Sequence, residues 1–328
     1  MQVLGYRILL ATTLMCVALS LPIRPAAAED ANRHFPKPVA LQAKVQFWKQ
    51  IYSEYGVADF VLHDRENLVA VYAVVRVVGI PNESRFAATA RPLIQQVRER
   101  FAAALESIAQ GTPPGDLGVE GARVAEVWGC PCAPEVLRRA AANIRVQQGH
   151  RERFQAGLER ARALLPGILS ILRRYNLPEE LAALPMVESS FHSGAQSKAG
   201  AVGLWQFIES TGRHYLTITR WRDDRSDPFL ATEGAARLLK DNYDALGTWP
   251  LAITAYIHGK GGVLAARTAV GSGAIEEIID RYTGPRFGFA SRNYYAEFLA
   301  ALELIQPTLL EHAQSSVSRA QPGPNRQG

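Results

Sequence analysis

Two spacings of hydrophobic residues divide this chain into a first part with strand signals and a longer helical part. From residue 151 onward, apolar residues recur every three or four positions, which is the period of an amphipathic helix. Asn176-Leu177-Pro178 ends this helix and opens the next, because proline is accepted in the first turn of a helix. The residues that carry the period are Phe154, Leu158, Ala161, Leu165, Ile168 and Leu172.

Further helices follow in the same part of the chain. Leu181 and Leu184 continue the apolar face up to Glu188, and the pattern predicts later helices over 232–245, 250–256 and 292–305. Residues 306–328 are polar, contain three prolines and have little to bury, so we expect a disordered tail there.

The first part mixes both kinds of structure. It predicts a short amphipathic helix over 43–55, and a strand, polar turn and second strand over 58–78, where β-branched and aromatic residues gather. A longer helix is expected over 87–110, and the Gly- and Pro-rich stretch 111–118 is expected to be a loop. The chain therefore reads as mainly α, with a small α+β N-terminal region of unknown role over 29–145 and a helical domain over 146–305.

The N-terminus is typical of an exported protein. Arg7 precedes an uncharged, mostly apolar stretch of 14 residues, 8–21, and Ala26-Ala27-Ala28 fits a small-residue cleavage site. This stretch is too short for a spanning helix, so we interpret residues 1–28 as a signal peptide, with a retained membrane anchor as the alternative. No later segment is long and apolar enough to span a bilayer.

Composition adds weaker limits. Cleavage after Ala28 would remove Arg7 and Arg24 and lower the formal net charge from +5 to +3. Such mild basicity is compatible with an anionic polymer such as cell wall, and no Lys/Arg cluster indicates nucleic acid. Cys130 and Cys132 would remain, and export makes a disulfide possible; we leave a local bridge open, because a one-residue spacing needs unusual backbone geometry.

Glu188 is the strongest candidate for chemistry. It is the only acid between Glu180 and Glu209, and its neighbours Leu184, Val187 and Phe191 are apolar. Desolvation raises the pKa of a carboxyl group, and a carboxyl that stays protonated near neutral pH can protonate a glycosidic oxygen. The alternative from this window alone is a helix-end Glu that points into water.

Other polar and small residues follow at short intervals. Ser197 precedes a glycine-rich stretch, 200–207, in which small residues would let the backbone approach a substrate closely and Gln206 could offer an amide. A charged run at 222–228 is interpreted as a solvated loop with local ion pairs. We expect Trp221 and Trp249 to lie in the core, and His192 and His258 to have surface or structural roles.

Four short motifs stand in order along the helical part: Glu188-Ser189, Gly203-Leu204-Trp205-Gln206, Ala255-Tyr256 and Arg292-Asn293-Tyr294. In order and spacing they resemble the soluble lytic transglycosylase family of lysozyme-like enzymes, especially its membrane-bound lytic murein transglycosylase D branch. The likeness covers roughly residues 145–305. One departure is Ile257, which stands where the family has asparagine after the tyrosine; the sugar-peptide repeat modules common in the D branch are also not evident.

The resemblance implies a lysozyme-like catalytic domain and a function. Glu188 would act as acid and then base in non-hydrolytic cleavage of peptidoglycan glycan strands. Ser197 and Gln206 would hydrogen-bond the N-acetyl group or groups near it, and Tyr256 would lie near Glu188 or the reacting sugar. Tyr294 would shape the pocket, and Trp205 would stack on a sugar or fill core. No metal and no organic cofactor is implied.

The expected location and partners follow from the same likeness. The protein would be periplasmic, with envelope association left open, and would act on glycan strands, with envelope proteins as possible partners of the N-terminal region. Two alternatives remain: a lysozyme- or chitinase-type hydrolase on the same fold, and a catalytically weak wall-binding scaffold.

Overall fold

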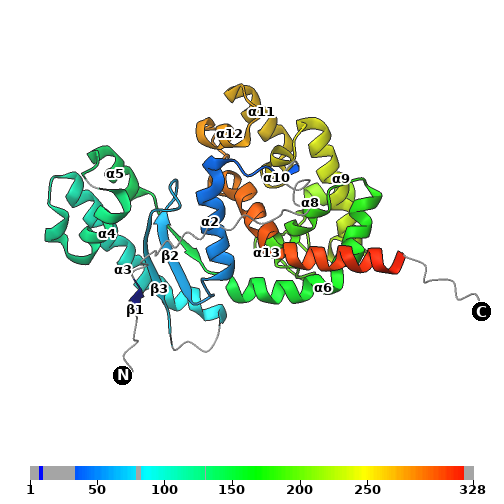
Figure 1. Cartoon of the computed structure of the whole chain (residues 1–328), viewed down its shortest axis with the longest axis horizontal. Helices are drawn as coiled ribbons and strands as arrows, with labels where there is room; N and C mark the ends of the chain where they lie inside the picture. Colours follow the sequence, from blue (N-terminus) through cyan, green and yellow to red (C-terminus); the bar gives the residue numbers. More distant parts are fainter. Residues whose placement is uncertain (1–6, 10–33, 79–82, 130, 321–328) are drawn as a thin grey trace, which may run out of the picture. The chain divides into compact units, whose positions relative to one another are not determined.

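The computed structural model describes residues 7–9, 34–78, 83–129 and 131–320 of the 328-residue chain (Figure 1). The chain forms two compact units, and the boundaries between them fall inside two helices, α2 (Val39–Ser53) and α6 (Arg151–Arg174). We call them the sheet unit, with strand 7–9 and residues 49–152, and the helical unit, with residues 34–48 and 153–320.

The sheet unit is built on a four-stranded antiparallel sheet with the order β1-β3-β2-β4. Its central hairpin is the strand–turn–strand that the sequence predicts, with Asp64 Oδ1 accepting the turn N–H groups of Glu66 and Asn67 at 2.8 and 2.7 Å. The fourth strand pairs with β2 and was not expected from the sequence. The strands are β1 (Arg7–Leu9), β2 (Asp59–Asp64), β3 (Val71–Arg76) and β4 (Ile144–Gln148).

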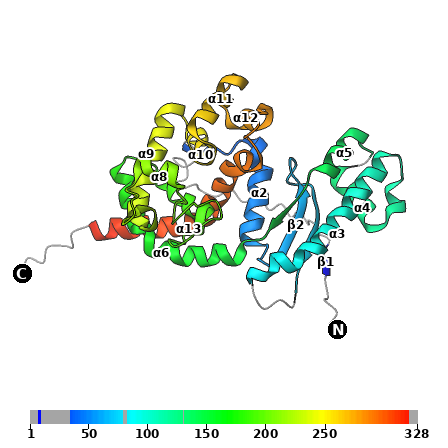
Figure 2. The ribbon, with the colours of Figure 1, turned by 180° about the vertical axis from the view of Figure 1, so that it is seen from behind.

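Helices cover one face of this sheet (Figures 1 and 2). The apolar stripe of α3, which includes Val97, Phe101 and Leu105, packs on sheet residues such as Leu62 and Tyr72 to form the core of the unit. The predicted loop over 111–118 contains a short 3₁₀ helix, and two helices that the sequence did not predict follow it. These elements are α3 (Glu83–Ala109), η1 (Pro114–Leu117), α4 (Gly118–Trp128) and α5 (Pro134–Ala142).

The helical unit contains the long periodic helix predicted from residue 151 and a cluster of shorter helices around α13 (Figure 2). Helix α13 packs against α10, α7 and η2, and α9 packs against α10 and α8. The remaining elements are η2 (Glu179–Ala183), α7 (Leu184–Ser189), α8 (Glu209–Tyr215), η3 (Asp224–Ser226), α9 (Pro228–Leu246), α10 (Trp249–His258), α11 (Lys260–Val270), α12 (Ile275–Arg281) and α13 (Phe289–Ala320).

The structure divides the chain differently from the boundary expected near residue 145. Residues 34–48 belong to the helical unit, where Phe35 packs on Phe298 with ring centroids 5.1 Å apart and Tyr295 donates to the Pro36 carbonyl at 2.8 Å. Residues 146–152 belong to the sheet unit, because β4 pairs with β2.

The predicted disordered tail is wrong for residues 306–320. Helix α13 continues through Pro307 to Ala320, and its inner face extends past the expected end at 305, since Ile305 and Thr308 are buried and Leu309 is half-buried on the same side. Residues 321–328 lie outside the described residues, as does the predicted cleavage site after Ala28. The predicted mainly α class, with a small α+β region, is confirmed. No helix in the described ranges is both long and apolar enough to cross a membrane.

Candidate active site around Glu188

Glu188 lies at the end of the short helix α7, immediately before a strained turn. Ser190 and Phe191 both adopt left-handed backbone conformations, with φ of 48° and 57°. Such non-glycine residues cost about 1–3 kcal/mol each and persist only where the surroundings hold them. Here the N–H groups of both residues return to α7 carbonyls, and the Phe191 ring is fully buried. The turn therefore fixes the position of the backbone from which the Glu188 side chain extends.

Arg160 of α6 holds this turn from outside. Its Nε and Nη2 donate to the Ser190 carbonyl at 3.1 and 2.8 Å. Nearby, Gly157 lets α6 approach α7, because a Cβ at that position would lie 2.7 Å from the Met186 sulfur. Neither residue was singled out from the sequence, since both contacts join segments about 30 positions apart.

The pKa of the Glu188 carboxyl group lies near neutral pH, well above that of a free carboxyl group. Burial is the dominant cause and raises its pKa from 4.5 to about 7, while a hydrogen bond donated by the Tyr294 hydroxyl to Oε1 opposes part of that rise. Among the described residues, no second carboxylate contributes to this shift. Glu188 is thus a single acid that is about half protonated at pH 7, as desolvation by its apolar neighbours predicts.

Two tyrosines form one wall of this site. The rings of Tyr256, on α10, and Tyr294, on α13, lie parallel to within 3° with centroids 6.4 Å apart. Tyr256 donates its hydroxyl to the Trp205 carbonyl at 2.7 Å, and Tyr294 donates to Glu188. Burial and then the Glu188 charge raise the pKa of both phenols well above 10, so both remain hydrogen-bond donors at neutral pH.

The loop after the turn is held by its own polar groups. Gly203 has φ of 82°, and a Cβ there would lie 1.8 Å from the Arg225 carbonyl, so the close approach is to another loop of the protein. Gln206, also left-handed with φ of 48°, donates its amide to the carbonyls of Gly203 at 2.8 Å and Ala195 at 3.2 Å. The Gln206 amide nitrogen therefore shapes the loop, and its amide oxygen is the group left to offer a ligand.

Ser189 joins this loop to the acid. Its hydroxyl donates to the Leu204 carbonyl at 2.8 Å and accepts the His192 N–H at 3.2 Å. The Glu-Ser pair is the one sequence signal that could have indicated this role, but Ser189 was not among the predicted site residues. It lies beside Glu188 in sequence and links α7 to the segment that carries Gln206.

The other predicted residues have mixed outcomes. Ser197 is exposed and its hydroxyl accepts the Ala201 N–H at 3.0 Å, closing a turn. Of the two roles left open for Trp205, its surroundings favour filling the core, because its side chain is fully buried and donates to Thr232 at 2.8 Å. Trp249 is buried as expected, whereas Trp221 is 85% exposed and not in the core.

The charged run forms ion pairs, as expected, but it is less solvated than predicted. Asp224 is buried and accepts from Arg222 at 2.6 Å and from the Thr217 N–H at 3.0 Å. Arg225 is also buried, pairs with Asp223 at 2.6 Å, and donates to the Phe207 carbonyl at 3.3 Å. This run supports the loop at 200–207, and it offers no unpaired acid.

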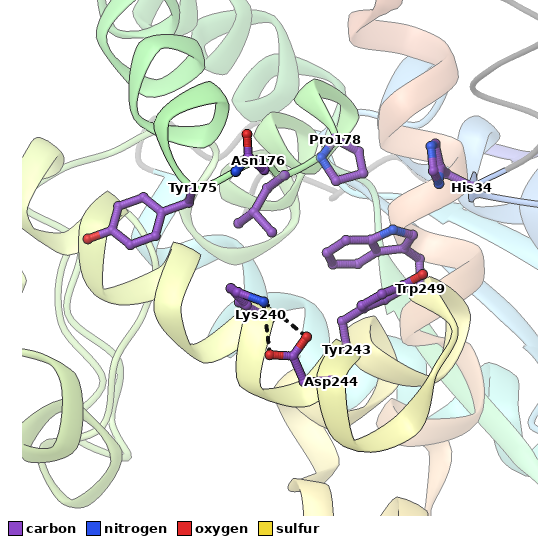
Figure 3. A pocket seen from close by; sticks show the side chains of 9 residues that line it. His34, Tyr175, Asn176, Pro178, Lys240, Tyr243, Asp244 and Trp249 are labelled. Atoms are coloured by element: carbon purple, nitrogen blue, oxygen red, sulfur yellow. Dashed lines mark hydrogen bonds and ion pairs between the residues drawn. The ribbon is translucent and has the colours of Figure 1, made fainter.

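A pocket of about 350 Å³ elsewhere in the helical unit lacks comparable chemistry (Figure 3). It lies where the turn after α6 faces α9 and the start of α10, and Tyr243 stacks on Trp249 there with centroids 4.4 Å apart. Its Lys240 and Asp244 bind each other at 2.9 Å. None of the predicted site residues lines it, so the acid at Glu188 is the better guide to a reaction centre.

Comparison with known families identifies the segment that holds this site. Residues 170–279 match the family model described as "Transglycosylase SLT domain". The matched segment includes Glu188, Gln206 and Tyr256, which confirms the resemblance expected from the motifs. Tyr294 lies beyond it, and its place in the site rests on the hydrogen bond to Glu188.

Two curated relatives match the SLT domain over 109 residues, 33% of this chain. Membrane-bound lytic murein transglycosylase D of Escherichia coli (strain K12) is 40% identical, over 24% of its length. A protein of Alteromonas sp. (strain M-1), whose name refers to tributyltin chloride resistance, is 35% identical, over 53% of its length. The chain thus spans about a quarter to a half of these relatives.

Proposed function

We propose that this protein degrades peptidoglycan as a lytic transglycosylase, with Glu188 as its acid and base. The observation that carries the proposal is a single carboxyl group with a pKa of about 7 inside the SLT domain. The 40% identity to a lytic murein transglycosylase over this segment supports the substrate class.

In the first step, protonated Glu188 donates its proton to the oxygen that links N-acetylmuramic acid to N-acetylglucosamine. The glycosidic bond breaks as that proton arrives, and the acetamido carbonyl of the same muramic acid closes on the anomeric carbon. Substrate assistance of this kind replaces the second carboxylate that most glycosidases use. It fits a site where Asp223 and Asp224 are committed to arginines.

In the second step, Glu188 is a carboxylate and takes the proton of the muramic acid C6 hydroxyl. That oxygen attacks the anomeric carbon and displaces the acetamido oxygen, which closes a 1,6-anhydro ring. The proton returns to Glu188, and no water is consumed. A pKa near 7 suits both steps, because neither protonation state is strongly disfavoured at neutral pH.

The surrounding polar groups have positioning roles in this scheme. Tyr294 orients the Glu188 carboxyl through its hydroxyl, and Tyr256 fixes the Trp205 carbonyl and hence the loop before Gln206. In this scheme the Gln206 amide oxygen accepts the acetamido N–H, which its amide nitrogen supports by holding the Gly203 carbonyl, and Ser197 lies at the outer turn of the same loop. We further propose that the protein acts in the periplasm after signal cleavage, which would remove strand β1 and leave β3, β2 and β4 in the sheet.

Mass spectrometry of soluble products from purified peptidoglycan tests the proposal. Fragments that end in 1,6-anhydro-N-acetylmuramic acid, lighter by one water than reducing-end products, are the expected result. Reducing-end products would instead indicate a hydrolase on the same fold. Absence of products with binding retained would indicate a wall-binding scaffold. A Glu188→Gln sample run in parallel excludes a contaminating enzyme.

A further inference from the structure

Trp221 is displayed on the surface of the helical unit. It is 85% exposed, more than any other large hydrophobic side chain in the part of the chain that the structure describes. An indole carries one of the largest apolar surfaces of any side chain, and leaving it in water forgoes that stabilisation. Single exposed apolar side chains are ordinary on protein surfaces, so the case for a role rests on how Trp221 is held and on its neighbours.

The backbone holds Trp221 at the tip of a closed turn. Ile218 and Asp223 form a bridge, and the Thr219 N–H donates to the Arg222 carbonyl at 2.7 Å. The Thr219 hydroxyl also accepts the N–H groups of Trp221 and Arg222 at 3.2 and 3.0 Å. The indole is thus presented on a preorganised support, which lowers the entropy lost when a ligand binds.

The same turn is tied to the Glu188 site through Arg225. The Arg225 guanidinium donates to the Gly200 and Phe207 carbonyls, each at 3.3 Å, at the two ends of the loop that carries Gln206. The Arg225 carbonyl lies against Gly203 in the middle of that loop. A ligand on the turn and a ligand at the acid would therefore share one rigid framework.

The chemistry of the tip favours a carboxylate-bearing sugar. The Arg220 guanidinium lies over one face of the Trp221 ring, 4.7 Å from its centroid, and Arg222 is exposed. The indole still exposes 85% of its surface, so a sugar ring can stack its C–H groups on the electron-rich face that Arg220 does not cover. The guanidinium at the other face can bind a carboxylate of the same strand. A bilayer is a poorer fit: Ile218 points inward and is 8% exposed, so the tip has one apolar side chain and no apolar face.

We propose that Trp221 and Arg220 form a binding platform for a carboxylate-bearing sugar unit of the glycan strand, outside the site at Glu188. This inference rests on the proposed function, because it takes the glycan strand as the ligand. The platform would hold a strand by a second point, so that release after each cleavage becomes slower.

Binding to insoluble peptidoglycan in a Glu188→Gln background tests the platform without cleavage. Adding Trp221→Ala is expected to weaken co-sedimentation by roughly five- to tenfold, and Arg220→Gln by a smaller factor. Trp221→Phe should recover part of the loss. Val39→Ala is the matched control, because Val39 is 80% exposed in the same unit, and it should change nothing. Circular dichroism of each variant checks that the fold is retained.

Two further arms identify the ligand. Glycan strands stripped of stem peptides keep the lactyl carboxylate. If Arg220→Gln still weakens binding to these strands, Arg220 binds the lactyl carboxylate. If Arg220→Gln weakens binding only to intact peptidoglycan, Arg220 binds the peptide carboxylates. Equal binding of Trp221→Ala and Val39→Ala to intact peptidoglycan would overturn the platform. A Trp221→Ala loss confined to phosphatidylglycerol vesicles would overturn it too, in favour of a membrane contact. The products of the wild-type protein are analysed in a separate experiment. The proposed reaction can therefore be refuted without refuting the binding platform.

Discussion

Glu188 and the pair Asp223 and Asp224 are carboxylates of the same helical unit in opposite electrostatic settings. At Glu188 burial dominates, no cation compensates, and the pKa rises to about 7. At Asp223 the hydrogen bond from Arg225 dominates and lowers the pKa. At Asp224 burial alone would raise the pKa, but bonds from Arg222 and the Thr217 N–H outweigh it and the net pKa is lowered.

The difference in pKa distinguishes a carboxyl group that can transfer a proton from carboxylates that stabilise a loop. A carboxyl group with a lowered pKa is ionised at every physiological pH and has no proton to give. Its partners instead fix loops: Asp224 accepts the Thr217 N–H just before the turn that carries Trp221, and Arg225 donates to the Phe207 carbonyl of the loop at 200–207. The same acid-to-amide substitution should therefore have opposite consequences at the two places.

The largest expected effect is on the reaction. Glu188→Gln should lower the rate of anhydro-product formation by roughly 10²–10⁴-fold, because an amide can neither donate nor accept the proton. Glu209→Gln is the control, since Glu209 is an exposed acid paired with Arg213, and it should retain activity. Product formation by Glu188→Gln at the wild-type rate would remove the basis of the comparison.

The next largest effect is on the free energy of unfolding, which we expect Glu188→Gln to increase rather than decrease at alkaline pH. A carboxyl whose folded pKa is raised stabilises the fold below its unfolded pKa near 4.5 and loses that contribution as pH rises through about 7. Glu188→Gln, which cannot titrate, should therefore be more stable than the wild type at pH 8 by up to about 3 kcal/mol. Denaturant unfolding at pH 5 and pH 8 measures this. An equal gain at both values would argue against a titrating Glu188.

Asp224→Asn should show the reverse behaviour. Its lowered pKa gives stability that is present above the unfolded pKa near 3.8 and is lost as pH falls through the lower folded value. The amide keeps an acceptor for the Thr217 N–H but loses the charge facing Arg222, so we expect a loss of about 1–2 kcal/mol at pH 7. The loss should shrink as the wild-type acid becomes protonated below pH 3. A gain in stability at pH 7 would contradict the assignment.

The smallest expected effect is a shift in a pH profile. The Tyr294 hydroxyl lowers the pKa of Glu188, so Tyr294→Phe should raise that pKa further. The limb of kcat/KM that falls above pH 7 should then move to higher pH, with only a several-fold change in the maximum. Tyr243→Phe, in the separate pocket, should leave the limb unchanged. A shift to lower pH would mean that Tyr294 does not donate to Glu188.

The features read correctly from the sequence are those with local causes. The period of Leu165, Ile168 and Leu172 is enough to predict α6, and all three are fully buried. The β2–β3 hairpin follows from a polar turn between apolar runs. The raised pKa of Glu188 agrees with the desolvation expected from its apolar neighbours within four positions.

The features that were missed depend on partners far along the chain. Trp205 is core because Thr232, 27 positions away, accepts its indole N–H, and Tyr294 meets Glu188 across 106 positions. Trp221 is exposed because it lies at the tip of a turn that the Thr219 hydroxyl holds closed. The composition of the charged run does not reveal this turn. Short elements such as β4 and α12 have too few residues to show a period.

The divided sequence of the helical unit has a consequence for the order in which the two units can fold. Pro36 and Lys37 contact Tyr295 and Glu303 across 259 and 266 positions, whereas residues 49–152 of the sheet unit form one uninterrupted stretch. The segment before α2 therefore stays without those partners until the chain has emerged as far as α13. The sheet unit can complete its core first, and the helical unit closes only when α13 has been made.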